Sequence, residues 1–126
     1  MRQSCIVTII DDDESVRFSL GSLVRSLGHA VHSYESADAF LAHRDQERSD
    51  CIVSDIQMPG TDGIALKHEL DARGSVVPMI MITARGELAL TEKAYASGVF
   101  GLMRKPLDLD PFIEMLEAAL RSSRTA

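Results

Sequence analysis

The stretch CIVSDIQMPGTDG, residues 51–63, decides the fold. It starts with a short apolar run and places Asp55 directly before a Met-Pro-Gly turn. An earlier apolar run, Ile6 to Ile10, ends in the acidic sequence Asp11-Asp12-Asp13. If the two runs are neighbouring parallel strands, their carboxyl ends meet at one edge of a sheet. The sequence therefore predicts a cluster of carboxylates at that edge.

Short apolar runs alternate with helical patterns along the whole chain. We expect five strands, at residues 5–10, 30–33, 51–54, 78–82 and 99–103. A helix is expected after each strand. The first covers residues 16–27, with Gly28 beyond its end, the second is capped by Ser36, and the third runs through Leu66 and Leu70, with Gly74 after it. The fourth covers residues 87–97 and the fifth covers 110–120, capped by Asp110.

Five strand–helix pairs favour an α/β fold of the flavodoxin-like (βα)5 type. This fold is a doubly wound parallel sheet, and its strand order is 2-1-3-4-5. In this order the first and third strands are neighbours, and ligands bind outside the carboxyl ends where the strand order reverses. The strands at that point end in Asp11-Asp12 and in Asp55.

A cluster of carboxylates is costly without a cation. Two like charges about 4 Å apart repel by about 4 kcal/mol at an effective dielectric constant of about 20. The site therefore needs a proton, a metal ion or a fixed positive group. Hard carboxylate oxygens favour magnesium, which keeps several waters and accepts phosphate oxygens. The third carboxylate is then available as a nucleophile toward phosphorus.

The composition is that of an ordinary globular domain, with 45% hydrophobic and 25% charged residues in a chain of 126. We assign residues 1–121 to one domain and 122–126 to a polar tail or the start of a linker. The net charge of -6, with no basic cluster, argues against direct nucleic acid binding. The sequence shows neither a secretion signal nor an apolar run of membrane length, so we predict a cytoplasmic domain without membrane contact. Cys5 and Cys51 fall in apolar runs, where free thiols pack as small hydrophobes.

Four strand ends carry residues that together resemble the receiver domain of two-component response regulators. These residues are Asp11-Asp12, Asp55 to Gly63, Thr83-Ala84 and Lys105-Pro106. The resemblance covers essentially the whole chain. Each piece is weak alone, but four correctly ordered strand ends make a specific pattern.

The resemblance implies that Asp55 is the phosphoacceptor, which takes a phosphoryl group from a sensor histidine kinase in a phosphorelay. It also implies a Mg²⁺ cofactor with Asp12 and Asp55 as direct ligands. Asp11 would act largely through water, and the Gln57 backbone carbonyl would supply a further oxygen. Three carboxylates, the Lys105 ammonium and one divalent ion sum to zero charge, which agrees with this assignment.

The remaining roles implied by the resemblance belong to the transferred phosphoryl group. Lys105 would hold one of its oxygens, and the Thr83 hydroxyl and the Ala84 backbone N–H would donate to others. Movement of Thr83 would then switch a partner surface around the fourth helix, fifth strand and fifth helix. Gln57 and Arg85 flank the site and are candidates for tuning the lifetime of the acyl phosphate.

The chain departs from the family pattern at Leu102, where the family usually has a switch tyrosine or phenylalanine. Leucine has no hydroxyl, so we expect the output to rely on Thr83 and the fourth helix more than on a rotating ring. Phe100 shares the predicted strand face but lies about 6–7 Å away along it. The family also usually has a cis peptide bond before the residue that is Pro106 here.

We expect a signalling module and not a turnover enzyme, with only its own phosphorylation and dephosphorylation to catalyse. One alternative is a magnesium phosphohydrolase of the haloacid dehalogenase type with Asp11 as nucleophile. A flavin carrier is disfavoured because acids follow the first strand, and a receiver that binds partners without phosphorylation is a further possibility.

Expected partners are a sensor kinase, a second copy after phosphorylation and a C-terminal DNA-binding output domain absent from this chain. The kinase, the output and the oligomeric state are left open by the sequence.

Overall fold

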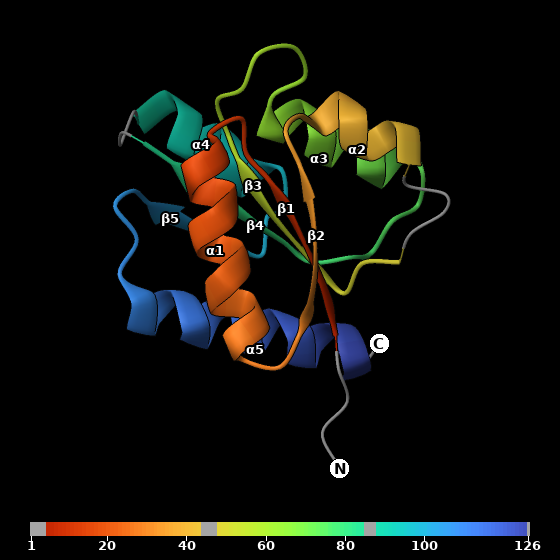
Figure 1. Cartoon of the computed structure of the whole chain (residues 1–126). Coiled ribbons are helices and arrows are strands. Elements are labelled where there is room, and N and C mark those ends of the chain that lie inside the picture. Colours follow the sequence, from red (N-terminus) through yellow and green to blue (C-terminus); the bar gives the residue numbers. More distant parts are fainter. Residues whose placement is uncertain (1–4, 44–47, 85–87, 126) are drawn as a thin grey trace.

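The computed structural model describes residues 5–43, 48–84 and 88–125, with side chains as far as residue 123 (Figure 1). Strands and helices alternate through these ranges, and each helix follows a strand. The elements are β1 (Ile6–Ile10), α1 (Glu14–Ser26), β2 (Ala30–Tyr34), α2 (Ala37–His43), β3 (Cys51–Asp55), α3 (Gly63–Ala72), β4 (Met79–Thr83), α4 (Leu88–Ala96), β5 (Gly101–Arg104) and α5 (Leu109–Thr125).

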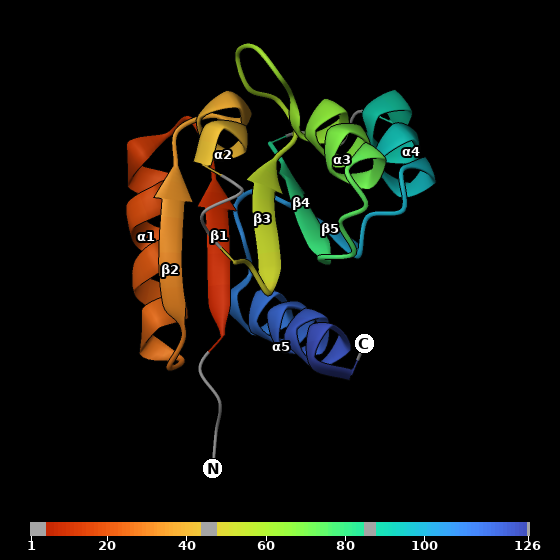
Figure 2. The same ribbon diagram turned by 90° about the vertical axis from the view of Figure 1, so that its right-hand side faces the viewer.

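The five strands form one parallel sheet in the order β2-β1-β3-β4-β5, as predicted. Figure 2 shows the arrows of β2, β1 and β3 side by side and pointing the same way, with β4 and β5 behind them. The strand order reverses between β1 and β3, where Ile10 is paired with Ser54. The carboxyl ends of these two strands therefore lie next to each other.

Two hydrophobic clusters cover the two faces of the sheet. The first joins α1 and α5 to β1, β3 and β4 through residues such as Val24, Ile80 and Phe112. The second joins α2, α3 and α4 to the other face, with Phe40 and Leu66 among its members. Side chains alternate between the two clusters along each strand because successive residues of a strand point to opposite faces. Cys5 and Cys51 are buried in the first cluster and are not joined in a disulfide.

Local rules placed most helix ends correctly. The side chain of Asp13 caps α1, that of Asp62 caps α3, and the Ser36 hydroxyl accepts the N–H of Ala39 in the first turn of α2. Gly28 and Gly74 follow α1 and α3 with φ of 94° and 81°, a conformation that suits glycine after a helix.

The last helix differs from the prediction at both ends. Helix α5 starts at Leu109 and runs to Thr125, so Asp110 lies in its first turn and is not its cap. The residues after Leu120 form a further helical turn where a polar tail was expected, because nothing between Arg121 and Thr125 breaks a helix. Among the described residues, no helix combines the length and apolar character needed to cross a bilayer.

Candidate functional site: an acidic cluster at the carboxyl edge of the sheet

The turn after β1 presents two aspartates in different environments. Asp11 is buried, at 1% exposure, and its carboxylate accepts the backbone N–H of Asp13 at 2.9 Å, whereas Asp12 is exposed. The backbone of Asp11 is held from two sides. Its N–H donates to the carbonyl of Tyr34 on β2, and its carbonyl accepts from Nη1 of Arg17 on α1 at 2.6 Å. The first carboxylate is therefore rigidly placed.

Asp55 ends β3 and is also buried, at 6% exposure. Its Oδ1 accepts the N–H of Gln57 at 3.3 Å. The first residue of α3, Gly63, packs directly against this strand end: its N–H donates to the carbonyl of Ile56, and a Cβ placed there would lie 2.6 Å from the carbonyl oxygen of Asp55. The absence of a side chain at Gly63 thus lets α3 approach the site closely.

Lys105 connects the two buried aspartates. Its ammonium lies 3.1 Å from Oδ2 of Asp55 and 3.2 Å from Oδ2 of Asp11. Its backbone N–H donates to the carbonyl of Thr83 at 2.8 Å, which links the end of β4 to the residue after β5. The peptide bond from Lys105 to Pro106 is cis.

The pKa values of Asp55 and Lys105 show that the site has too little positive charge for its carboxylates. Burial raises the pKa of Asp55, the hydrogen bond from Lys105 lowers it and the charge of Asp11 raises it again, so the net pKa is above the ordinary 3.8. Burial lowers the pKa of Lys105, but its bonds to Asp55 and Asp11 outweigh this and leave the pKa above 10.5. The ammonium therefore stays charged at neutral pH, and the site still favours a further cation.

The donor atoms suit a hard divalent ion. Asp11, Asp12 and Asp55 each offer a carboxylate oxygen, and these oxygens lie within 4.8 Å of one another. Ligand oxygens of an octahedral magnesium ion are about 3–4 Å apart, given Mg–O distances of about 2.0–2.1 Å. Small side-chain rotations would bring the three oxygens to that spacing. The residues present therefore fit magnesium.

The other predicted site residues lie at the same edge of the sheet. Thr83 is buried at the end of β4, and Ala84 follows it in an exposed position. Gln57 is exposed two residues after Asp55, and Arg85 lies outside the described residues.

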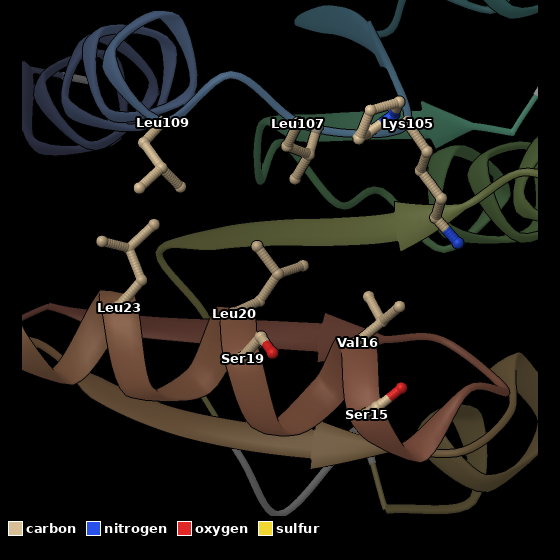
Figure 3. Close-up of a pocket in the computed structure, with 9 residues that line it drawn as sticks. Ser15, Val16, Ser19, Leu20, Leu23, Lys105, Leu107 and Leu109 are labelled. Atoms are coloured by element: carbon tan, nitrogen blue, oxygen red, sulfur yellow. The ribbon is translucent and has the colours of Figure 1, made fainter.

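A cavity of about 490 Å³ opens beside Lys105, between α1 and the segment that leads from β5 to α5 (Figure 3). In Figure 3 the side chains of Leu20 and Leu23 on α1 face Leu107 and Leu109 across this space. The walls are mainly apolar. Lys105 thus borders both the acidic cluster and an open apolar cavity.

Leu102 and Phe100 lie in different surroundings. Leu102 is half-buried beside Met81 of β4 and packs against the cluster under α4. Phe100 precedes β5 and is 40% exposed; with Val76 it lines a second cavity, of about 210 Å³, at the amino ends of β4 and β5. Strand β5 starts at Gly101, so Phe100 lies just outside it, although the predicted strand 99–103 included this residue.

Two side-chain contacts at this edge were not predicted. One is the bond from Arg17 to the carbonyl of Asp11 described above. The other joins Thr61, in the segment between β3 and α3, to Asp38 on α2 at 2.8 Å. Neither has a local sequence pattern that reveals it, because each joins separate elements of the fold.

Comparison with known families decides what this arrangement belongs to. A sequence model of the response regulator receiver domain matches residues 7–117. The chain belongs to the response regulator receiver domain family. The match includes all seven predicted site residues, from Asp11 to Lys105. The family named from the strand-end residues is thus confirmed, and with it a place in two-component signal transduction.

Individual relatives agree with this assignment. The receiver is 39% identical over 98% of its length to the transcriptional regulatory protein FixJ of Azorhizobium caulinodans, and covers 58% of that protein. It is 34% identical over 94% of its length to the DNA-binding transcriptional regulator NtrC of Salmonella typhimurium, and covers 25% of it. The crystal structure of FixJ-N matches with a TM-score of 0.87 at 33% identity, over 95% of this chain and 96% of that one. The receiver therefore spans only part of these two longer regulators.

Proposed function

We propose that this receiver accepts a phosphoryl group on Asp55 from a sensor histidine kinase in a magnesium-dependent reaction. The observation that supports this most strongly is the position of Lys105, whose ammonium lies within 3.2 Å of both Asp55 and Asp11. Phosphoryl transfer depends on positioning and on cations around the phosphoryl oxygens more than on covalent work by the protein. The acidic cluster and the lysine supply both requirements.

In the proposed reaction, a carboxylate oxygen of Asp55 attacks the phosphorus of a phosphohistidine. A P–O bond forms as the P–N bond breaks. The electron pair of the P–N bond stays on the imidazole nitrogen, which takes a proton from water. A magnesium ion held by Asp11, Asp12, Asp55 and the Gln57 carbonyl would neutralise charge on the phosphoryl oxygens. Lys105 then turns from the Asp55 carboxylate toward one of these oxygens.

The phosphoryl group would also recruit the end of β4. The Thr83 hydroxyl and the Ala84 N–H donate to its oxygens, and Ala84 is small and exposed enough to let it approach. Lys105 is already joined to Thr83 through the backbone. Movement at Thr83 therefore shifts β5 and α4 together, and the exposed side chains of Leu88 and Tyr95 give this region an apolar partner surface.

The family and the cavity beside Lys105 suggest which partners bind. The apolar cavity between α1 and the β5–α5 segment offers a kinase a binding surface next to the site. Because NtrC is a DNA-binding regulator and the chain covers 25% of it, we propose that a longer form carries a C-terminal DNA-binding output domain. We also propose that phosphorylation promotes pairing of two receivers and that the domain works in the cytoplasm. We keep residues 1–121 as the domain and propose that the last turn of α5, which runs to Thr125, starts the linker.

The test is chemical labelling with a small phosphodonor, acetyl phosphate, in the presence of magnesium. Intact mass should show one phosphoryl group on the wild-type receiver and none on Asp55→Asn. A chelator should abolish the label. A label that survives Asp55→Asn and is lost in Asp11→Asn would instead support the haloacid dehalogenase reading and overturn the proposal.

A further inference from the structure

The segment between β3 and α3 extends past the carboxyl edge of the sheet (Figure 2). The hydroxyl of Thr61 in this segment donates to Oδ1 of Asp38, on the first turn of α2, at 2.8 Å. The two residues are 23 positions apart. The bond therefore ties two elements that local sequence does not bring together.

A second contact places the same segment against the same carboxylate. A Cβ added at Gly60 would lie 3.0 Å from Oδ2 of Asp38. Gly60 has φ of 78°, a conformation that favours glycine, so the backbone turns here directly over the aspartate. Both oxygens of Asp38 thus face the segment.

The ends of this segment are fixed in other ways. At its start the N–H of Ile56 donates to Ile82, and at its end the N–H of Gly63 donates back to Ile56. Between these anchors lie the exposed Gln57 and the bond from Thr61 to Asp38. The segment that starts with Gln57 is therefore held from α2 farther along, at Gly60 and Thr61.

We propose that Asp38 and Thr61 are positioning residues that hold the segment carrying the Gln57 carbonyl in place for a divalent cation. The inference rests on the proposed function, because it concerns the magnesium site of the same receiver. Releasing the bond leaves the three carboxylates in place but loosens the segment that supplies the fourth oxygen. The affinity for magnesium falls, and the fold itself changes little because both side chains lie at the surface.

The test is a magnesium titration by calorimetry, using magnesium chloride and the full chain. Asp38→Ala and Thr61→Val should each raise the dissociation constant about two- to fivefold, the effect of one exposed hydrogen bond. Asp38→Asn keeps an acceptor and removes the charge, so its dissociation constant should stay near that of the wild type. The matched control is Asp71→Ala, which removes an exposed aspartate that accepts one bond from Lys67 on α3.

A double-mutant cycle separates a shared bond from two unrelated effects. The double variant of Asp38→Ala and Thr61→Val should bind magnesium no more weakly than either single variant. Additive losses, a loss in Asp38→Asn equal to that in Asp38→Ala, or an equal loss in Asp71→Ala would overturn the proposal. If the wild type binds magnesium and takes the label at Asp55 while all variants match it, only the positioning role fails. If the wild type binds no magnesium, the proposed function fails first.

Discussion

The ammonium of Lys105 lies 3.1 Å from Oδ2 of Asp55, although the two residues are 50 positions apart in the chain. The same ammonium lies 3.2 Å from Oδ2 of Asp11. One positive charge is thus shared by two buried carboxylates, with the exposed Asp12 beside them. This imbalance is the physical basis of the first two predictions.

Magnesium should stabilise the folded receiver. An ion that binds only the folded state, at a free concentration about a hundred times its dissociation constant, adds about 2.7 kcal/mol to the free energy of unfolding. Urea unfolding with magnesium and with a chelator measures this difference. Asp55→Asn should lose most of it, because one carboxylate ligand is gone. A gain in Asp55→Asn equal to that of the wild type would place the ion elsewhere.

Removal of the Lys105 charge should destabilise the receiver in chelator and increase the stabilisation that magnesium gives. In chelator, Lys105→Met leaves two buried carboxylates without their cation and should lower the free energy of unfolding by about 1–3 kcal/mol. Magnesium should then stabilise the variant more than the wild type, since it no longer shares the site with an ammonium. Lys105→Arg, which keeps the charge, is the control. Equal magnesium effects in all three proteins would contradict a shared site.

The contact between Gly63 and Asp55 should be sensitive to a single methyl group. Gly63→Ala places a Cβ 2.6 Å from the Asp55 carbonyl oxygen, and backbone atoms must move to relieve this contact. We expect a loss of about 1–3 kcal/mol in the free energy of unfolding, together with weaker magnesium binding. Gly21→Ala is the control, because its Cβ meets only the flexible side chain of Arg25, at 3.3 Å, and Val31, at 3.7 Å. A Gly63→Ala variant that is as stable as the wild type and binds magnesium normally would refute this.

Sequence reasoning recovered the five strands because apolar runs bounded by turn residues are local patterns. It also placed the cap Ser36, since a capping side chain bonds to backbone within three residues. It failed at Asp110 because Asp108 lies two residues away, and local preference does not choose between two aspartates at a helix start. The N–H of Phe112 bonds to the carbonyl of Asp108, which sets the start of α5 earlier.

The sequence predicts which strand ends meet at the site, but it does not predict the side-chain contacts between separate elements. Parallel strands force Asp11 and Asp55 to one edge, so their meeting follows from topology. The contacts from Arg17 to Asp11 and from Thr61 to Asp38 depend on side-chain directions across separate elements. No spacing rule in a single sequence encodes those directions.

Leu102 offers a test of how the proposed phosphorylation would reach the proposed partner surface. Its side chain packs under α4 beside Met81, where a tyrosine would add volume and a hydroxyl. We expect Leu102→Tyr to enlarge the amide shifts of α4 and β5 that a phosphoryl mimic produces, because the wild type has no ring to rotate. The comparison uses amide NMR spectra of both proteins with and without the mimic. Matching shifts would count against a diminished relay.

The stability of the fold should fall at alkaline pH through Cys51. Burial raises the pKa of this thiol to about 12 from an ordinary 9.0, and the charge of Asp50 adds to the shift. Above pH 9 the unfolded chain loses this proton first, so the free energy of unfolding falls as pH rises toward 12. The loss from this thiol is about 1.4 kcal/mol between about pH 8 and 10. Urea unfolding of Cys51→Ala should show a shallower decline; an equal slope would show that other groups cause it.

Helix α5 is one unbroken rod of 17 residues, about 25 Å long. Leu109 at its start borders the cavity beside Lys105, and Ser122 near its end borders the second cavity with Val76 and Phe100. No break interrupts the helix between these two ends. One continuous element thus joins the edge that carries Lys105 to the opposite edge, and it packs against the sheet over the distance between them.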